Sequence, residues 1–520
     1  MLQFPSTCAA SAPDRPAVIV GETGQSLTFA ELEARSNKVA HVLRGEGLTV
    51  GDHVAMLLEN RTEFFEVMWA ALRSGVYITP INWHLNPAEV AYIVNDCGAS
   101  LLVGSADLLG KLDDVELPPE RRIAVGGPVP GLRDYETLLA ESSAAPIDDQ
   151  SEGSYMFYSS GTTGRPKGIM SPTIGGEIGA PNSFSGLMSV MFGFTEDSVY
   201  LSPSPLYHAA PAGWTTGGHR LGSTAIVMER FDPIEVLELI QRHKVTHVQF
   251  VPTHMVRLLK LPEEVRNRYD LSSLQYVIHA AAPCPPAVKR AFIEWVGPKV
   301  HEYYSGSEGM GFCIIGPEEW LAHPGSVGKS LLGAVHIVDA DGNEVGPREE
   351  GQVYFETPSK IEYHGDPEKT RSAFNDQGWG SLGDVGWVDE DGYLYLTDRV
   401  SNMIISGGVN IYPREVEDIL VGHPDIADAA VIGVSHPDMG ESVRAIVEPE
   451  GPVDDEDVFA AEVIEYCRAN LSRFKCPTTV ALVGTLPRLQ TGKISKRLFA
   501  DWLRQPYPDG VIVETDLADS

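Results

Sequence analysis

The sequence has little cysteine and few cations for its length. Its 520 residues include six cysteines without a CxxC pair, so neither a disulfide framework nor a zinc site is expected. Lysine and arginine number 39 against 72 acidic residues, and the net charge of −33 argues against nucleic acid or an anionic membrane as main partner. No apolar run reaches the roughly 18 residues of a membrane span, and the N-terminus lacks a signal-peptide pattern. We therefore expect a cytoplasmic protein.

The composition fits a folded globular chain. Hydrophobic residues make up 43% and aromatic residues 8% of the sequence. At about 150 residues per domain, the length predicts roughly three structural units. Thr28 and Glu31 form a capping box that predicts a helix running to Gly45 or Gly47. Apolar strand patterns at 53–58 and 76–80 enclose a helical pattern at 62–74, so a parallel sheet covered by helices is expected.

The pattern changes along the chain. A helix at 233–243 leads into a strand at 245–251, whereas residues 325–400 show short strands between Asp-Gly turns and predict a β-rich region. After Arg399 the pattern fits a small α+β unit. The last residues, 505–520, are polar and acidic and are expected to be poorly ordered.

A loop rich in glycine and hydroxyl groups carries the strongest chemical signal. It follows an apolar strand at 155–157 and can wrap phosphate oxygens with amides and hydroxyls, with one lysine adding a cation. The residues concerned are Ser159, Ser160, Gly161, Thr162, Thr163, Gly164 and Lys167. A Walker-like stretch at 325–330 has His323 where that motif needs glycine, so we interpret it as a turn.

Five motifs in a fixed order resemble those of the adenylate-forming superfamily, which holds acyl-CoA synthetases, peptide-synthetase adenylation domains and firefly-type luciferases. They lie at 158–168, 204–208, 304–308, 383–417 and 487–493. The resemblance implies α/β and α+β architecture: a large N-terminal domain at 1–400 with α/β layers and a β-barrel-like subdomain, and a small mobile domain at 401–504. Ser401 would be the hinge, and 505–520 an acidic tail.

The resemblance also assigns a nucleotide site. Tyr304 would stack on adenine, and Ser307 would bind near the phosphate. Glu308 would hold Mg²⁺, a cation that prefers oxygen ligands. Asp384 would accept from the ribose hydroxyls and Arg399 would reach the ribose or phosphate. The small-residue loop expected against the adenine comprises Ala281, Ala282 and Pro283.

Further roles concern the reacting groups. Lys493 would bridge the carboxylate and the α-phosphate, since one placed ammonium can stabilise the charge that develops between two anions. His208 would gate the space between acid and thiol, although a histidine beside Tyr207 can equally be a packed residue. Coenzyme A would pass Gly407, Gly408 and Lys475. The expected acyl pocket comprises Tyr207, Trp214, Gly217, Ser305, Gly306, Met310 and Gly311.

These assignments predict an enzyme that uses ATP, Mg²⁺ and coenzyme A. It would join a hydrophobic carboxylic acid to AMP and then to the thiol, and the acid could be fatty, aryl or alicyclic, such as a steroid side-chain acid. Three alternatives stay open: an adenylation enzyme that loads a carrier protein, a fatty-acyl-AMP ligase, and a regulator that binds nucleotide without catalysis. A homodimer also stays open, and no nucleic-acid partner is expected.

Overall fold

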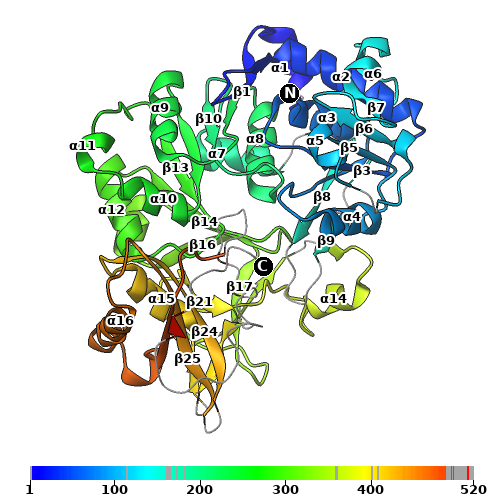
Figure 1. Cartoon of the computed structure of the whole chain (residues 1–520). Helices are drawn as coiled ribbons and strands as arrows, with labels where there is room; N and C mark the ends of the chain where they lie inside the picture. Colours follow the sequence, from blue (N-terminus) through cyan, green and yellow to red (C-terminus); the bar gives the residue numbers. More distant parts are fainter. Residues whose placement is uncertain are drawn as a thin grey trace.

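The computed structural model describes most of the chain and arranges it as two large sheets with a smaller unit beneath them (Figure 1). The described residues are 3–112, 115–159, 166–170, 174–180, 183–357, 361–399, 402–406, 409–436, 439–487, 494, 496 and 512–513.

The larger sheet has thirteen strands among the described residues. The strands from β14 to β1 run parallel. The strand pairs from β14 to β17 are antiparallel, and so is the pair of β1 with β2 at the opposite edge. In spatial order the strands are β17 (Ala334–Val338), β18 (Gly351–Glu356), β20 (Asp384–Val388), β21 (Leu394–Arg399), β16 (Ser326–Leu332), β15 (Phe312–Ile315), β14 (Val300–Tyr304), β13 (Tyr276–His279), β12 (His247–Phe250), β10 (Val199–Ser202), β11 (Thr224–Val227), β1 (Pro16–Val20) and β2 (Ser26–Thr28).

The second sheet has eight described strands, six of them in one parallel run from β8 to β7. Their order is β19 (Glu362–Tyr363), β9 (Lys167–Met170), β8 (Ser154–Ser159), β4 (Tyr77–Pro80), β3 (His53–Leu57), β5 (Leu101–Ser105), β6 (Arg122–Val125) and β7 (Arg133–Asp134). In sequence β19 lies between β18 and β20 of the larger sheet, so its pairing with β9 ties the two sheets together.

Helices cover these sheets, as the alternating sequence pattern predicts. They are α1 (Pro5–Ser11), α2 (Phe29–Gly45), α3 (Thr62–Arg73), α4 (Pro87–Asp96), α5 (Ala106–Leu109), α6 (Tyr135–Glu141), α7 (Ser183–Phe192), α8 (Ala209–Arg220), α9 (Pro233–His243), α10 (Pro252–Leu259), α11 (Glu263–Arg266), α12 (Pro286–Val296), α13 (Pro317–Ala322) and α14 (Pro367–Ser372). The predicted helices at the N-terminus and at 233–243 are confirmed, and so is the β-rich region after residue 325.

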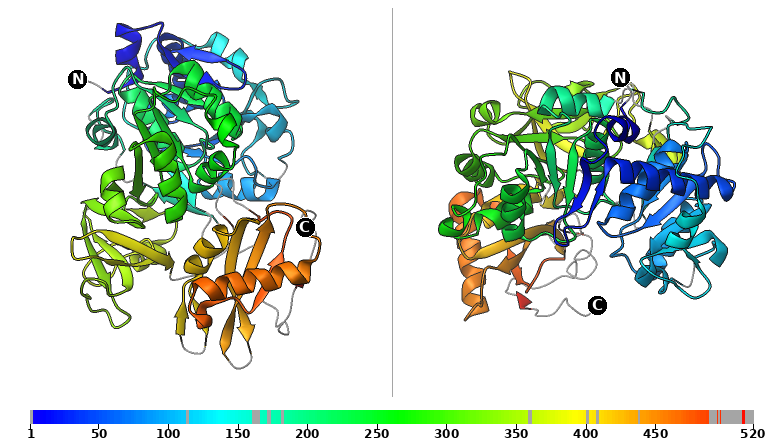
Figure 2. Two further views of the ribbon diagram at one scale, coloured as in Figure 1. Left: turned by 90° about the vertical axis from the view of Figure 1, so that its left-hand side faces the viewer. Right: turned by 90° about the horizontal axis from the view of Figure 1, so that it is seen from above.

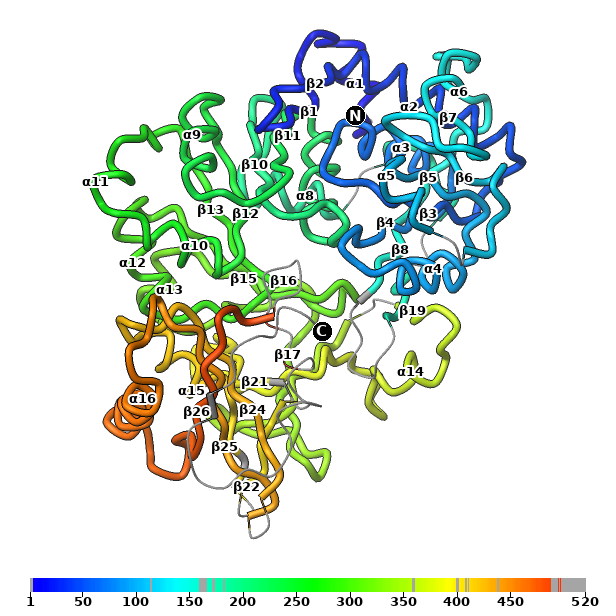
Figure 3. The backbone as a smooth tube through the Cα atoms, viewed as in Figure 1, coloured from blue at the N-terminus to red at the C-terminus, as the bar shows by residue number. Residues whose placement is uncertain are grey.

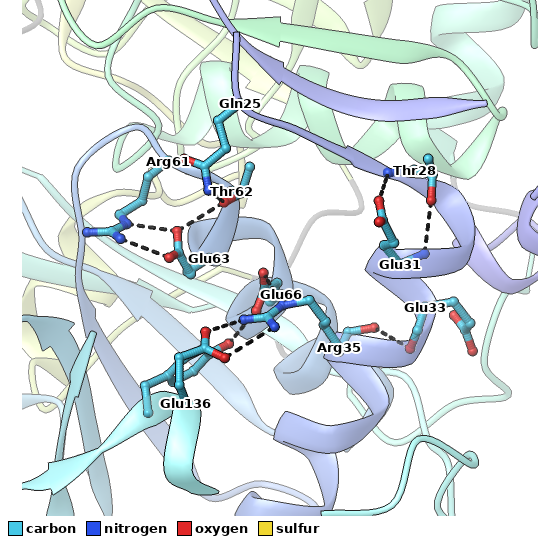
Figure 4. Close-up of polar contacts among 12 residues, drawn as sticks. Gln25, Thr28, Glu31, Glu33, Arg35, Arg61, Thr62, Glu63, Glu66 and Glu136 are labelled. Atoms are coloured by element: carbon cyan, nitrogen blue, oxygen red, sulfur yellow. Dashed lines mark hydrogen bonds and ion pairs between the residues drawn. The ribbon is translucent and has the colours of Figure 1, made fainter. Parts of the chain in front are cut away.

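A polar network fixes the first helices against each other (Figure 4). The predicted capping box is present: the Thr28 hydroxyl accepts from the Glu31 amide at 3.2 Å, and the Glu31 carboxylate accepts from the Thr28 amide at 2.8 Å. On the next turn Arg35 joins Glu66 of α3 and Glu136 of α6, with 2.7 Å between Arg35 Nε and Glu66 Oε1. Since Glu66 is buried, desolvation raises the pKa of its carboxyl group, and the pairing with Arg35 offsets part of that effect.

The C-terminal unit has a hydrophobic core of its own, which includes Ile404, Val416, Val431 and Val463. It lies beneath the two sheets in Figure 1 and in the left view of Figure 2. An ion pair between Lys260, which follows α10, and Glu450 joins it to the larger body. Its elements are β22 (Ile404–Ser406), β23 (Val409–Ile411), α15 (Pro413–Val421), β24 (Ile426–His436), β25 (Gly440–Pro449), α16 (Glu456–Asn470), β26 (Thr479–Leu482) and β27 (Ile512–Val513).

One prediction needs correction. The stretch at 325–330 is not a turn, because Ser326–Leu332 forms β16 between β15 and β21. Gly328 has φ +96°, and a Cβ there would lie 1.9 Å from the carbonyl oxygen of Ile314, so the glycine is required by close backbone packing. Within the predicted acidic tail, Ile512–Val513 pairs in parallel with β26.

All six cysteines are buried and free of disulfides. Across the described ranges, every helix is too short or too polar to cross a lipid bilayer.

Candidate active site

Two residues predicted to hold the nucleoside meet at the antiparallel end of the larger sheet. Tyr304 ends β14 and Asp384 begins β20. The Tyr304 hydroxyl donates to Asp384 Oδ2 at 2.5 Å. Asp384 is buried, with 7% of its surface exposed, so its carboxylate is held in one orientation. The expected adenine platform and the expected ribose acceptor are therefore one connected unit.

The predicted metal ligand lies four residues beyond Tyr304. One oxygen of the half-buried Glu308 carboxylate, Oε1, accepts from the hydroxyl of Tyr363 at 3.0 Å. Tyr363 is buried and belongs to β19, where it pairs with Ile169 of β9. This arrangement fixes one carboxylate oxygen, and among the described residues Oε2 stays available to a hard cation.

Lys167, the cation of the predicted phosphate loop, begins β9. Its Nζ lies 2.8 Å from Oδ2 of Asp366, the N-cap residue of α14. This contact raises the pKa of Lys167 and lowers that of Asp366. Figure 3 shows α14 beside β19, and the pairing of β19 with β9 brings Lys167 and Glu308 to the same region through Tyr363.

The expected adenine loop follows β13. Ala281 has φ +74°, a left-handed conformation that is unusual for a residue other than glycine. Backbone strain of this kind clusters at ligand sites, which supports the functional interpretation of Ala281, Ala282 and Pro283. A packed core of small residues would not require it.

The first half of the predicted acyl pocket packs between α7 and α8. Trp214 is fully buried, and its indole Nε1 donates to the Tyr303 hydroxyl at 3.2 Å. A Cβ on Gly217 would lie 2.4 Å from Sδ of Met188. The space that glycine leaves on α8 is therefore filled by a flexible thioether of α7, which can change its rotamer to admit a ligand.

The second half lies around the Tyr304 loop and is closely packed. Ser305 donates to the carbonyl oxygen of Gly311 at 2.9 Å, which closes the loop. Met310 is fully buried beside Tyr363, and a Cβ on Gly311 would meet the Phe355 ring at 2.2 Å. A Cβ on Gly306 would lie 2.5 Å from the Leu382 side chain. These glycines serve packing of the loop in this structure.

Tyr207 and His208 form the N-terminal edge of α8. Their rings lie 4.4 Å apart, and His208 is the N-cap residue without a side-chain cap bond. The Tyr207 hydroxyl is buried and has no hydrogen-bond partner in the described structure, and burial raises the pKa of Tyr207. Ser307, by contrast, is exposed.

The remaining predicted residues concern the C-terminal part. Lys475 Nζ lies 2.8 Å from Oε1 of Glu415 on α15. Arg399 ends β21, where Asp398 accepts from the backbone amide of Arg414 at 3.1 Å. Outside the described residues, or with only their backbone described, are Ser159, Ser160, Gly161, Thr162, Thr163, Gly164, Arg399, Ser401, Gly407, Gly408 and Lys493.

Comparison with known proteins decides the family. The protein-family model for AMP-binding enzymes matches residues 6–361, and the family model for the AMP-binding enzyme C-terminal domain matches residues 415–493. The chain belongs to the AMP-binding enzyme family. The predicted superfamily, its two-part fold and an AMP-forming ligase as its enzyme class are thereby confirmed.

Three relatives show the range of this AMP-binding family. The long-chain-fatty-acid–CoA ligase FadD13 of Mycobacterium tuberculosis is 31% identical over 96% of this chain and 97% of its own. The fatty acid–[acyl-carrier-protein] ligase ScoC of Streptomyces coeruleorubidus is 28% identical over 96% of both chains. The o-succinylbenzoate CoA synthetase MenE of Bacillus subtilis, solved with its acyl-adenylate OSB-AMP, has a TM-score of 0.79 at 26% identity and covers 98% and 99% of the two chains.

Sequence reasoning missed three residues of this AMP-binding chain: Tyr363, Asp366 and Lys369. Asp366 before Pro367 is a helix-start signal, yet nothing local relates that helix to Glu308. The relation arises from the pairing of β19 with β9, which joins segments almost two hundred positions apart. The structure alone brings these residues to the site.

Proposed function

We propose that the protein activates a hydrophobic carboxylic acid as acyl-AMP and transfers the acyl group to coenzyme A. In the first step a carboxylate oxygen attacks the α-phosphorus of ATP, and pyrophosphate leaves. In the second step the coenzyme A thiol attacks the acyl carbonyl, and AMP leaves. The observation that carries the proposal is the Tyr304–Asp384 unit with Glu308 beside it, in a chain that belongs to the AMP-binding family.

Each of the proposed nucleotide-binding residues would bind a different part of ATP. Tyr304 offers a ring for stacking on a base, and Asp384 offers an acceptor for the ribose hydroxyls. The donor set fits Mg²⁺, because Glu308 presents a carboxylate that Tyr363 holds by one oxygen only. When bound, the ion would neutralise phosphate charge. Lys493 would supply the ammonium between the carboxylate and the α-phosphate.

The proposed acceptor is reached by movement of the C-terminal unit. We place the division near Ser401, with residues 1–400 holding the nucleotide and acid and residues 401–504 bringing Gly407, Gly408 and Lys475 to the thiol. His208 would separate the acid from the thiol. Closure would exclude water from a mixed anhydride that water destroys. The proposed location is the cytoplasm, where ATP and coenzyme A are both available.

The acid is proposed to be apolar. The pocket residues around α8 are aromatic or small, and Trp214, Phe192 and Phe194 lie in one buried cluster. The relatives FadD13 and MenE are ligases of long-chain fatty acids and of o-succinylbenzoate, which supports a fatty or aryl acid for this chain. Tyr207, Ser305, Gly306, Met310 and Gly311 are proposed as the remaining walls.

A panel of fatty, aryl and alicyclic acids tests the function. Pyrophosphate release would be measured with each acid, first without an acceptor and then with coenzyme A or a phosphopantetheinylated carrier protein. We expect acid-dependent release and an acyl-CoA product. The carrier protein is the second candidate acceptor because ScoC, similar over 96% of both chains, uses one. Release without any thioester would contradict the proposed acceptor.

A further inference from the structure

A second lysine contacts the tyrosine that holds Glu308. Lys369 occupies the third position of α14, where its backbone amide donates to Asp366 Oδ1 at 2.9 Å. Its Nζ lies 4.3 Å from the centre of the Tyr363 ring, a distance at which the aromatic face attracts a cation. The hydroxyl of that same ring donates to Glu308. One tyrosine therefore holds the carboxylate at its edge and the ammonium over its face.

The two lysines of this region differ in their partners. Lys167 is neutralised by Asp366, with 2.8 Å between Nζ and Oδ2. Lys369 forms no ion pair with a carboxylate of the described chain. Burial lowers the pKa of Lys369, and the charges of Glu308 and Lys167 act on it in opposite directions. An ammonium has three donors, so Lys369 retains hydrogen-bonding capacity toward an incoming anion.

We propose that Lys369 is a further ATP-binding residue, and that it contacts the β- and γ-phosphates that leave together as pyrophosphate. The proposal rests on the proposed function, which puts the triphosphate at Glu308. As the bond from the carboxylate to the α-phosphorus forms, the bond to the bridging oxygen breaks and its electron pair leaves with pyrophosphate. An ammonium at that end stabilises the increasing charge.

The contact between Lys369 and the Tyr363 ring suits a cation that binds phosphate. A cation that binds an incoming polyphosphate has two needs. It must be held near the site, and it must not be neutralised by a permanent carboxylate partner. The Tyr363 ring meets both needs, because its attraction is weaker than that of a paired carboxylate and leaves the donors available. Asp366 serves the backbone of Lys369 and the side chain of Lys167, so it aligns both lysines.

Calorimetric titration of the full chain with ATP, pyrophosphate and AMP tests the proposal. Lys369→Met should weaken ATP and pyrophosphate roughly 10- to 100-fold, the range for a hydrogen bond to a charged group, and leave AMP within about twofold. Lys369→Arg should retain most of the affinity. Arg371→Met is the matched control, since it removes one exposed cation from the same helix and should change nothing.

Several outcomes would overturn the assignment. AMP affinity that falls as far as ATP affinity would mean that Lys369 supports the nucleoside or the fold, and the melting temperature would separate these. A loss seen only with Mg²⁺ would mean that Lys369 acts through Glu308 and not on phosphate. Unchanged ATP and pyrophosphate affinities would refute it outright.

The titration and the assay of acid-dependent pyrophosphate release together separate this proposal from the proposed function. If no acid supports pyrophosphate release but ATP and AMP discrimination changes as expected, the ligase activity fails and the role of Lys369 stands. If acids are activated normally by Lys369→Met with an unchanged KM for ATP, the role of Lys369 fails and the ligase stands. A wild-type chain that binds neither ATP nor pyrophosphate would refute both.

Discussion

The hydroxyl of Tyr304 donates to Oδ2 of Asp384 across 2.5 Å, although 80 positions separate the two residues in sequence. The contact connects the end of β14 with the start of β20, two strands that do not pair with each other. One residue offers an aromatic face and the other an anionic acceptor, so the proposed contacts to base and sugar would share one hydrogen bond.

That bond predicts a shared defect. Tyr304→Phe keeps the ring but removes the donor that orients Asp384, so AMP and ATP should both bind about five- to tenfold more weakly, as expected for one lost hydrogen bond. Titration with the two nucleotides measures this, and equal factors are expected. If ATP alone were weakened, the Tyr304–Asp384 unit would act at the phosphates and not at the nucleoside.

Tyr363→Phe should act on magnesium. The change removes the hydroxyl that donates to Glu308 and keeps the ring beneath Lys369. We expect the Mg²⁺ concentration for half-maximal pyrophosphate release to rise several-fold, because a less oriented carboxylate is a weaker ligand. Binding of ATP without Mg²⁺ should stay unchanged, and a fall there would assign Tyr363 to the phosphates.

Lys493→Ala should divide the two half-reactions. Loss of one placed cation typically slows a step about 10²- to 10³-fold, so acid-dependent pyrophosphate release should fall by that factor. Thioester formation from supplied acyl-AMP should continue. Equal loss in both assays would contradict the assignment of Lys493 to adenylation.

Alanine substitutions at two glycines of the Walker-like stretch should lower the stability of the fold by different amounts. Gly328→Ala puts a Cβ 1.9 Å from the carbonyl oxygen of Ile314 and should destabilise the fold by about 3 kcal/mol or more. Gly325→Ala is the matched control: its φ is also positive, at +90°, but the nearest atom to a Cβ is 3.9 Å away. It should cost about 1 kcal/mol. Calorimetric melting compares them, and equal losses would leave only backbone strain as the cause.

Stability should fall in mild acid because His219 is buried as the neutral ring. Its Nδ1 accepts from Trp69 at 3.1 Å and its Nε2 lies 2.9 Å from the Ala17 carbonyl, so protonation of Nδ1 breaks the first bond. Burial lowers the pKa of His219 to about 4 from an ordinary value of 6.5. Between those values the unfolded chain binds a proton that the folded chain does not, and up to about 3 kcal/mol is lost as pH falls.

His219→Gln is the test variant for this pH effect. It removes the titrating ring, so its free energy of unfolding should fall less steeply between pH 6.5 and pH 4 than that of the wild type. Denaturant unfolding at several pH values measures the slope. A variant slope equal to the wild-type slope would assign the acid sensitivity to other groups, such as His247, whose pKa burial also lowers to about 4.

Local patterns were sufficient for most elements of the larger body. The Thr28–Glu31 capping box and the apolar spacing at 62–74 specify α2 and α3 because helix starts and helix faces are local properties. The stretch at 325–330 misled because its glycines resemble a turn. Gly328 is instead required by the close approach of Ile314 in β15, a contact that no neighbouring residue in the sequence reveals.

The site was predictable only in part, for a related reason. Residues such as Tyr304 and Asp384 lie in motifs whose expected roles came from the family resemblance, whereas Tyr363 and Lys369 gain theirs from the neighbours that strand pairing supplies. Packing around Met310 and Gly311 was also out of reach, since it depends on Phe355 and Tyr363 from distant strands.

The ion pair between Lys260 and Glu450 has a consequence for how tightly the C-terminal unit is tethered. Both side chains are more than one-third exposed, so the pair contributes at most about 1 kcal/mol. Dissolved ions screen such charges over roughly 8 Å at physiological strength. If the C-terminal unit moves as proposed, its own apolar core stays intact, so added salt should shorten the lifetime of this docked arrangement while the melting of either body stays nearly constant.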